Sequence, residues 1–233
     1  SEVGKGWRVL LAEAVDGEER PDVPRGGRER EPGVARRVDA PADDDGRLTA
    51  IGHEALIYSN RNDPFVEQTA TVTRSLYAAP NRMTRHRSTH LDLPNGEAVR
   101  APGEMAGLLA VEIAMDELAE RLAIDPVELR VLNDTALDPE TGVPLTGRRL
   151  SECLRTGAQR FGWSQRDSEP GKRREGQWLL GMGVASAIRF HFQGPAEVEV
   201  AVRPTGRIEV RSDLTDIGTG SYTILAQIAA ELL

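Results

Sequence analysis

Apolar residues recur at helical spacing through the middle of the chain. One series of positions, spaced by three and four, consists of Leu108, Val111, Met115, Leu118 and Leu122. This spacing predicts an amphipathic helix. The positions on the other side carry charged groups, namely Glu112, Asp116, Glu117, Glu120 and Arg121. We expect Glu112, Asp116 and Glu117 to face solvent rather than to form an acid–base pair.

Further helices are predicted after this one. Asp125, Pro126 and Glu128 stand at the N-cap, N1 and N3 positions of a strong helix start. Apolar residues at positions 150, 153, 154, 158 and 161 predict the next helix over 150–161. Cys153 lies on its apolar face, so we expect a buried and unreactive thiol. A last, apolar helix is predicted over 224–233.

Strand patterns occupy the flanking regions. Residues 47–59 read as a strand, and the alternation at 198–202 and 208–210 around a Pro-Thr-Gly turn predicts a β-hairpin. Residues 179–192 form a region rich in small residues that we interpret as strand. The stretch from 60 to about 100 follows neither period and is interrupted by Asn, Pro and Gly, so it is interpreted as irregular.

These patterns predict an α+β fold in several parts. Residues 1–38 are poor in apolar positions after Leu11, and we leave them unassigned, as a disordered or aberrant N-terminal segment. Residues 39–164 form a first folded part, 165–175 a polar linker, and 176–233 a second part. No C-cap signal follows the last helix, so we expect the chain to be truncated inside a fold.

The composition and charge of the chain argue against several classes of protein. The 233 residues carry a net charge of -8 with 28% charged residues, and the arginines are interspersed with carboxylates, which argues against a nucleic-acid surface. A single cysteine excludes an internal disulfide and a cysteine cluster for zinc or iron–sulfur. No apolar run reaches the roughly 20 residues that a membrane span needs, and no signal peptide is recognisable.

Two loops are candidates for chemistry. Arg100 precedes a Pro-Gly pair at the start of the predicted helix, where an arginine can face an anion or a developing oxyanion. Residues 217–223 (IGTGSYT) form a glycine loop before the last helix, and its backbone amides can hold a phosphate or a polar heterocycle. Taken alone, each motif is also compatible with an ordinary surface loop. The glycine loop matches neither the dinucleotide fingerprint nor the P-loop.

No metal site is predicted from the histidines. His86 and His90 lie four residues apart, but the sequence between and after them argues against a helix. We expect these two, His53 and His191 to be surface or hydrogen-bonded core residues.

Several stretches in order carry a family resemblance. They are DGRLTAIGHEALIYS, YAAPN, AVRAPGEMAGLLAVEIAMDELAERLAIDPVELRVLND, LSECLRTGAQRFGW and DIGTGSYTILAQIAAEL. Over about residues 39–233 the chain resembles the molybdopterin-binding large subunit of the xanthine dehydrogenase/aldehyde oxidase family of molybdenum hydroxylases. Within that family it is most similar to the bacterial periplasmic aldehyde oxidoreductases.

The resemblance implies an oxidoreductase and its cofactors. The family oxidises aldehydes or N-heteroaromatic compounds with oxygen from water. The resemblance implies a molybdenum–pterin cofactor, molybdopterin or its cytosine dinucleotide, and two partners, an iron–sulfur subunit and an FAD subunit. It also implies that residues 39–164 and 176–233 are parts of two molybdopterin-binding domains. The compartment stays open between cytoplasm and periplasm, because such subunits can be exported with a partner.

The resemblance also assigns residues. Arg100 matches the active-site arginine that orients substrate, and Gly218, Thr219, Gly220, Ser221 and Thr223 match a loop that contacts the pterin cofactor. The family's catalytic glutamate and its upstream Gly-Gly-x-Phe-Gly loop have no counterpart here, so we expect the isolated chain to be inactive. The alternative is a fragment that contributes a cofactor cradle or an assembly surface without activity of its own.

Overall fold

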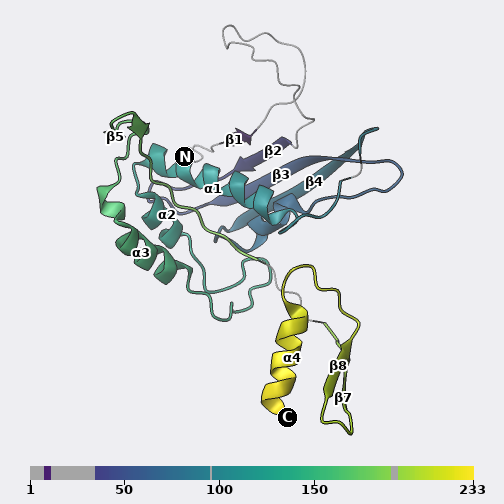
Figure 1. Cartoon of the computed structure of the whole chain (residues 1–233). Helices are drawn as coiled ribbons and strands as arrows, with labels where there is room; N and C mark the ends of the chain where they lie inside the picture. The colour runs from purple at the N-terminus through teal and green to yellow at the C-terminus, as the bar shows by residue number, and fades with distance from the viewer. Residues whose placement is uncertain (1–7, 12–34, 95, 190–193) are drawn as a thin grey trace. The chain divides into compact units, whose positions relative to one another are not determined.

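The computed structural model describes residues 8–11, 35–94, 96–189 and 194–233. The chain divides into two compact units, residues 1–189 and 190–233. Together they contain helices and small sheets, which confirms the α+β class (Figure 1).

A four-stranded sheet in the order β1-β2-β3-β4 forms one layer of the first unit (Figure 1). β1 (Arg8–Leu11) pairs antiparallel with β2 (Ala35–Asp39), and β2 pairs antiparallel with β3 (Ala50–Ser59). Burial alternates along β3, whose buried positions are Ile51, His53, Ala55, Ile57 and Ser59. The predicted strand over 47–59 is therefore confirmed, and one face of the sheet covers the core.

The fourth strand was missed by the sequence interpretation. β4 (Asn81–His90) pairs in parallel with β3, and the connection between them contains the 3-10 helix η1 (Thr69–Arg74). This region was interpreted as irregular, and that prediction was wrong. β4 is polar along most of its length and has no buried residue, so it shows no alternation between apolar and polar positions.

Helix α1 (Glu104–Leu122) forms the second layer and packs against the sheet and η1 (Figure 1). Val111, Met115 and Leu118 from its predicted apolar stripe are buried in the core. The helix approaches η1 closely at Gly107, where an added Cβ would lie 1.9 Å from the carbonyl oxygen of Thr69. Only glycine fits this contact, because there is no room for a side chain.

The other face of α1 is not solvent-facing throughout, and the expectation for Glu112 was wrong. Its side chain is buried and accepts hydrogen bonds from Tyr77 Oη at 2.6 Å, Arg130 Nε at 2.8 Å and the Ser186 backbone N–H at 2.7 Å. The Asp116 side chain is exposed and that of Glu117 is partly exposed, and Asp116 also pairs with Arg130. Helix α1 is thus covered on two sides.

Two shorter helices follow α1. α2 (Pro126–Leu132) begins as predicted, since the Asp125 side chain accepts from the backbone N–H groups of Val127 and Glu128. α3 (Leu150–Phe161) confirms the predicted helix. Cys153 is exposed rather than buried, because α3 buries only Leu154 fully and leaves its neighbours near solvent.

Residues 163–189 complete the first unit. They include η2 (Trp163–Gln165) and the two-stranded pair β5 (Arg174–Glu175) and β6 (Trp178–Leu179). Residues 180–189 lie outside any sheet, so the strand predicted over 179–192 is wrong for these positions; residues 190–192 lie outside the described residues. This segment packs on the core through Ile188.

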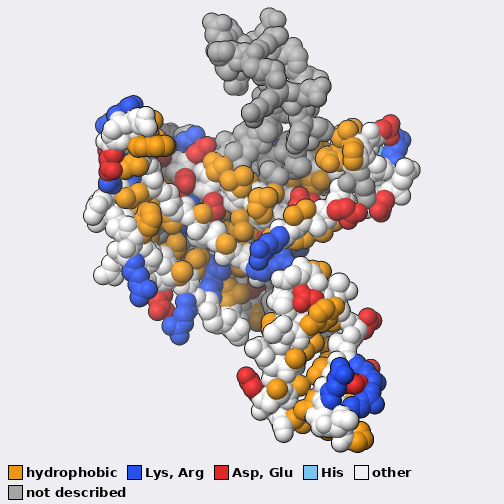
Figure 2. All heavy atoms as spheres, in the orientation of Figure 1, with side chains coloured by type: hydrophobic (Ala, Val, Ile, Leu, Met, Phe, Trp, Pro, Cys, Tyr) orange, Lys and Arg blue, Asp and Glu red, His pale blue; other side chains and the backbone are white. Residues whose placement is uncertain are grey.

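The second unit contains a hairpin and one helix. β7 (Val198–Val202) and β8 (Ile208–Ser212) pair antiparallel, and α4 (Ser221–Leu232) follows, which confirms the hairpin and the last helix. No residue described in this unit is fully buried. In Figure 2 much of its surface is apolar, and arginines and carboxylates gather on the hairpin, where Arg203 and Arg211 pair with Glu209. A cavity of about 640 Å³ lies between β8 and α4.

The predicted domain boundaries stay a prediction. Of the N-terminal segment 1–38, residues 8–11 and 35–38 are described as strand, and the rest lies outside the described residues. Among the described residues, no helix is both long and apolar enough to cross a membrane.

Candidate functional site

The loop that carries Arg100 has an unusual backbone held by close contacts. Ala101 and Gly103 both adopt positive φ, of 57° and 84°. A Cβ on Gly103 would lie 2.6 Å from the backbone carbon of Gln68, so the loop rests directly on the chain before η1. The Gly103 N–H donates to Oε1 of Glu67 at 2.9 Å. These contacts fix the turn that immediately precedes α1.

Arg100 is presented to solvent by this turn. Its side chain is exposed, and the described part of the chain offers it no hydrogen bond, ion pair or ring contact. The first turn of α1 follows, and a helix start carries a partial positive charge. An arginine next to it therefore adds to a local preference for an anion or for a substrate oxygen that gains negative charge.

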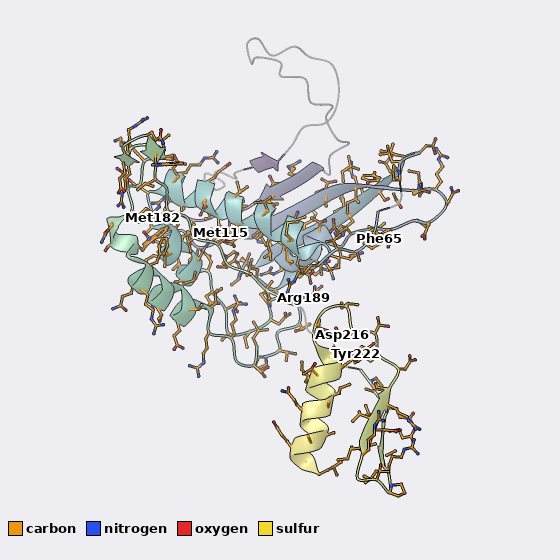
Figure 3. All side chains as sticks on the ribbon, viewed as in Figure 1. Phe65, Met115, Met182, Arg189, Asp216 and Tyr222 are labelled. Carbon is orange, nitrogen blue, oxygen red and sulfur yellow. The ribbon has the colours of Figure 1, made fainter. Side chains whose placement is uncertain are left out.

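Glu104, the first residue of α1, is buried beside this loop. Its Oε1 pairs with Nη1 of Arg189, the last described residue of the first unit, and its Oε2 is buried without a hydrogen-bond partner. Figure 3 labels Arg189 where the chain leaves this unit.

The glycine loop of the second unit is built around Asp216. Its Oδ1 accepts from the backbone N–H groups of Gly218 at 2.8 Å, Thr219 at 2.9 Å and Gly220 at 3.2 Å. Donation from the Gly218 N–H, with those of Gly220 and Thr219, lowers the pKa of the Asp216 carboxyl below its ordinary value. The amides expected to cradle a ligand thus already have an internal acceptor.

Further donors of the loop are hydroxyl groups and the N–H groups at the start of α4, although the Thr219 hydroxyl also donates to Asp216 Oδ1 at 3.4 Å. The hydroxyls of Thr219 and Ser221 lie 2.8 Å apart, and Ser221 and Thr223 belong to the first turn of α4, whose N–H groups lack acceptors within the helix. Gly218 and Gly220 adopt φ of 98° and 76°, and nothing lies within 4 Å of a Cβ built on either. Tyr222 Oη donates to the Leu214 carbonyl and accepts from the Asp216 N–H, so it fastens the loop to the helix start (Figure 3).

Three residues of these loops were missed by the sequence interpretation. Glu67, Glu104 and Asp216 act on the loop backbones or on a neighbouring charge, and none of them was assigned a role. Glu104 and Asp216 lie within the quoted stretches, whereas Glu67 lies outside them. Asp216 was detectable in principle, because an aspartate two residues before a Gly-x-Gly run is a common turn acceptor. Glu67 lies 36 residues from Gly103, and no local signal connects them.

The histidines behave as predicted where they are described. His53 is buried, and its Nδ1 lies 2.7 Å from Thr73 Oγ1. His86 Nε2 accepts from the Ala70 N–H at 2.9 Å, whereas His90 is exposed. No group of three or more metal-ligating side chains occurs in the described ranges. His191 lies outside them.

The chain matches two family models in succession. Residues 27–134 and 156–233 each match a molybdopterin cofactor-binding domain. The first match begins upstream of residue 39, where the resemblance was expected to start. The chain belongs to the molybdenum-binding subunits of the xanthine dehydrogenase/aldehyde oxidase family.

Particular relatives agree with this assignment. The aldehyde oxidoreductase molybdenum-binding subunit PaoC of Escherichia coli O157:H7 is 49% identical over 92% of this chain and 29% of its own length. The xanthine dehydrogenase molybdenum-binding subunit of the same organism is 35% identical over 62% of this chain and 20% of its own length. The chain thus spans less than a third of the length of these relatives.

Solved structures show the same fold. Quinoline 2-oxidoreductase from Pseudomonas putida 86 aligns with a TM-score of 0.61 and 20% identity, covering 84% of this chain and 28% of that one. The aldehyde oxidoreductase from Desulfovibrio gigas aligns with a TM-score of 0.52 and 20% identity, covering 76% of this chain and 20% of that one.

Proposed function

We propose that this chain contributes an active-site arginine and a cofactor-binding loop to a molybdenum hydroxylase that oxidises aldehydes or N-heteroaromatic compounds. The observation that carries the proposal is Arg100: it is exposed and unpaired among the described residues, on a loop held by Gly103 and Glu67. Two consecutive molybdopterin-binding domains and the 49% identity to an aldehyde oxidoreductase subunit support it.

The residues of the glycine loop fit a molybdenum–pterin cofactor. Open space above Gly218 and Gly220 leaves room for a flat or bulky group at the backbone. The hydroxyls of Thr219, Ser221 and Thr223 and the backbone N–H groups of Ser221 and Thr223 at the start of α4 can donate to a phosphate or to pterin heteroatoms. Because Asp216 already occupies the amides of 218–220, we propose that hydroxyls and the α4 start, rather than those amides, make the contacts.

Arg100 has a defined task in this proposal. When bound, the molybdenum–pterin cofactor supplies the redox chemistry that moves oxygen from water to carbon and removes two electrons. The guanidinium of Arg100 would hold the substrate oxygen or ring nitrogen and stabilise the negative charge that develops there. The contacts of Gly103 with Glu67 and Gln68, which hold this loop, would add to this effect by reducing the reorganisation needed when the charge develops.

The finer assignments belong to the same proposal. We infer a pterin cofactor of the molybdopterin type, either as such or as its cytosine dinucleotide, with iron–sulfur and FAD carriers on partner subunits. Residues 39–164 and 176–233 would be parts of the two cofactor-binding domains. The compartment is the cytoplasm or the periplasm.

A chimera tests the proposal. The stretch of the E. coli PaoC subunit that matches this chain is replaced by the chain's own residues, and molybdenum content and aldehyde oxidation are measured. We expect a molybdenum-loaded, active chimera in which Arg100→Ala lowers kcat/KM by about 10²–10³ with molybdenum retained. Arg160→Ala is the matched control, because Arg160 is exposed and has no partner among the described residues.

The alternative function is one outcome of this test. A folded chimera that binds molybdenum but is insensitive to Arg100→Ala would leave the chain as a cofactor cradle without a catalytic residue. A folded chimera without molybdenum would overturn the cofactor assignment itself. Ser221→Ala and Thr223→Ala separate the cofactor-binding role from the catalytic role, since they are expected to reduce molybdenum content and to leave the turnover per bound molybdenum unchanged.

A further inference from the structure

Two carboxylates belong to the surroundings of the Arg100 loop, one in contact with its Gly103 and one at the start of the helix that follows, and in the described part of the chain neither is paired with Arg100. Glu67 accepts from the Gly103 N–H, three residues after Arg100. Glu104 pairs with Arg189, although Arg100 is the nearest other cation along the sequence. An exposed arginine near a carboxylate can pair with it, at a gain of up to about 1 kcal/mol. In this structure both are occupied by other donors.

Arg189 reaches Glu104 because its segment is docked along α1. Glu112, eight residues after Glu104 and therefore about two helical turns away, accepts from the Ser186 N–H at 2.7 Å. Ile188 packs on the core between these two anchor points. The segment therefore runs along α1 in a set register, which brings Arg189 to the first residue of the helix.

The burial of Glu104 makes its charge partner important. The Glu104 side chain is 11% exposed, and its Oε2 has no hydrogen-bond partner, whereas the Arg189 side chain is 64% exposed. A buried carboxylate that is only partly satisfied is a strong attractor for a neighbouring cation. Without Arg189, the nearest guanidinium to Glu104 along the sequence is that of Arg100, four residues before it.

We propose that Arg189 is a positioning residue that keeps Glu104 occupied, so that Arg100 stays unpaired and available to substrate. The importance of Arg189 for catalysis rests on the proposed role of Arg100. Its effect on the pairing of Arg100 can be measured without catalysis. Arg189 acts through Glu104 and contacts no reacting atom. The pair also ties the start of α1 to the point where the chain leaves the first unit.

The test measures the reactivity of Arg100 in the 233-residue chain. Phenylglyoxal modifies free guanidinium groups faster than ion-paired ones, and mass spectrometry of peptides identifies the Arg100 site. We expect Arg189→Gln to slow modification of Arg100 by about five-fold, the upper range for an exposed ion pair. Arg189→Lys keeps the charge and is expected to retain the original rate. Modification of Arg160 serves as the internal reference.

The double variant separates this role from a structural one. In Glu104→Gln/Arg189→Gln the attracting charge is gone, so Arg100 is expected to react at the original rate. If Arg189→Gln leaves the Arg100 rate unchanged, the proposal is wrong. It is equally wrong if the single and double variants change that rate alike, because this would indicate a merely loosened loop. Neither result depends on a bound cofactor, so a failure of this proposal would not by itself contradict the proposed function.

Discussion

Replacing Glu112 by glutamine probes the most buried charge cluster of the first unit. The Arg130 side chain is 0% exposed, and its Nε donates to Oε2 of Glu112 at 2.8 Å. Burial lowers the pKa of Arg130, but Glu112 together with Tyr77 and Asp116 outweighs this effect, and the pKa is raised above its ordinary value. Tyr77 Oη and the Ser186 N–H also donate to Glu112. The substitution keeps the shape of the side chain and removes its charge.

The magnitude follows from what remains around Arg130. Its other charged partner, Asp116, is 49% exposed and therefore screened by solvent. The carbonyl oxygens of Pro126 and Glu112 accept from its guanidinium but carry no net charge. Removing one partner of a buried pair typically costs about 3–5 kcal/mol, and we take about 3 kcal/mol because Asp116 and the carbonyls remain.

Urea unfolding followed by circular dichroism measures this cost. With an m value of about 2 kcal/mol/M, a loss of about 3 kcal/mol lowers the midpoint by about 1.5 M. Glu112→Gln/Arg130→Met, which removes both charges, should recover much of the loss, because two apolar or neutral groups no longer leave a buried charge unpaired. Arg155→Gln is the control: its pair with Glu128 is exposed, and it should cost less than about 0.5 kcal/mol.

A small effect of Glu112→Gln would refute this reasoning. A midpoint shift below about 0.3 M would mean that Asp116 and the two carbonyls satisfy Arg130 by themselves. A double variant as unstable as the single one would mean that packing, rather than charge, makes the network important.

Three further predictions address the loops and the helix contacts. Gly107→Ala places a Cβ 1.9 Å from the Thr69 carbonyl, so we expect a loss of about 3 kcal/mol in the free energy of unfolding; thermal unfolding unchanged from the original chain would contradict this contact. Burial raises the pKa of Asp134, but hydrogen bonds from Ser151 and Arg148 outweigh it and lower that pKa below 3.8, so the stabilisation by the Asp134 carboxylate is present above pH 3.8 and lost as the pH falls through the lowered value. Asp134→Asn should therefore lower the free energy of unfolding at neutral pH and reduce its decline in acid. Parallel curves of stability against pH for the variant and the original chain would contradict this. Asp216→Ala removes the acceptor of three loop amides, so hydrogen exchange at those amides should accelerate at least about ten-fold. Exchange in β7 and β8 should stay the same. Unchanged protection of the three amides would show that the loop holds its shape without Asp216.

Local interactions explain which elements could be predicted. The start of α2 depends on Asp125 and Pro126, which act within three residues of each other, so the sequence pattern was sufficient. The hairpin of β7 and β8 closes through a short turn and follows the same logic. The two candidate loops were located by their glycines and by family resemblance, and their roles remain proposals.

The helices, the hairpin, the family and the places of Arg100 and the glycine loop along the chain follow from periodicity, capping and motifs, which are local properties of the sequence. The tertiary structure alone decided that Glu112 is buried, that β4 is a strand, and that Cys153 is exposed. It also decided which donors occupy Glu67 and Glu104. These outcomes depend on contacts between segments far apart in the chain, such as that of Ser186 with Glu112. Hydrophobic periodicity marks only the apolar face of a helix, so it does not reveal that a second, polar face is also covered.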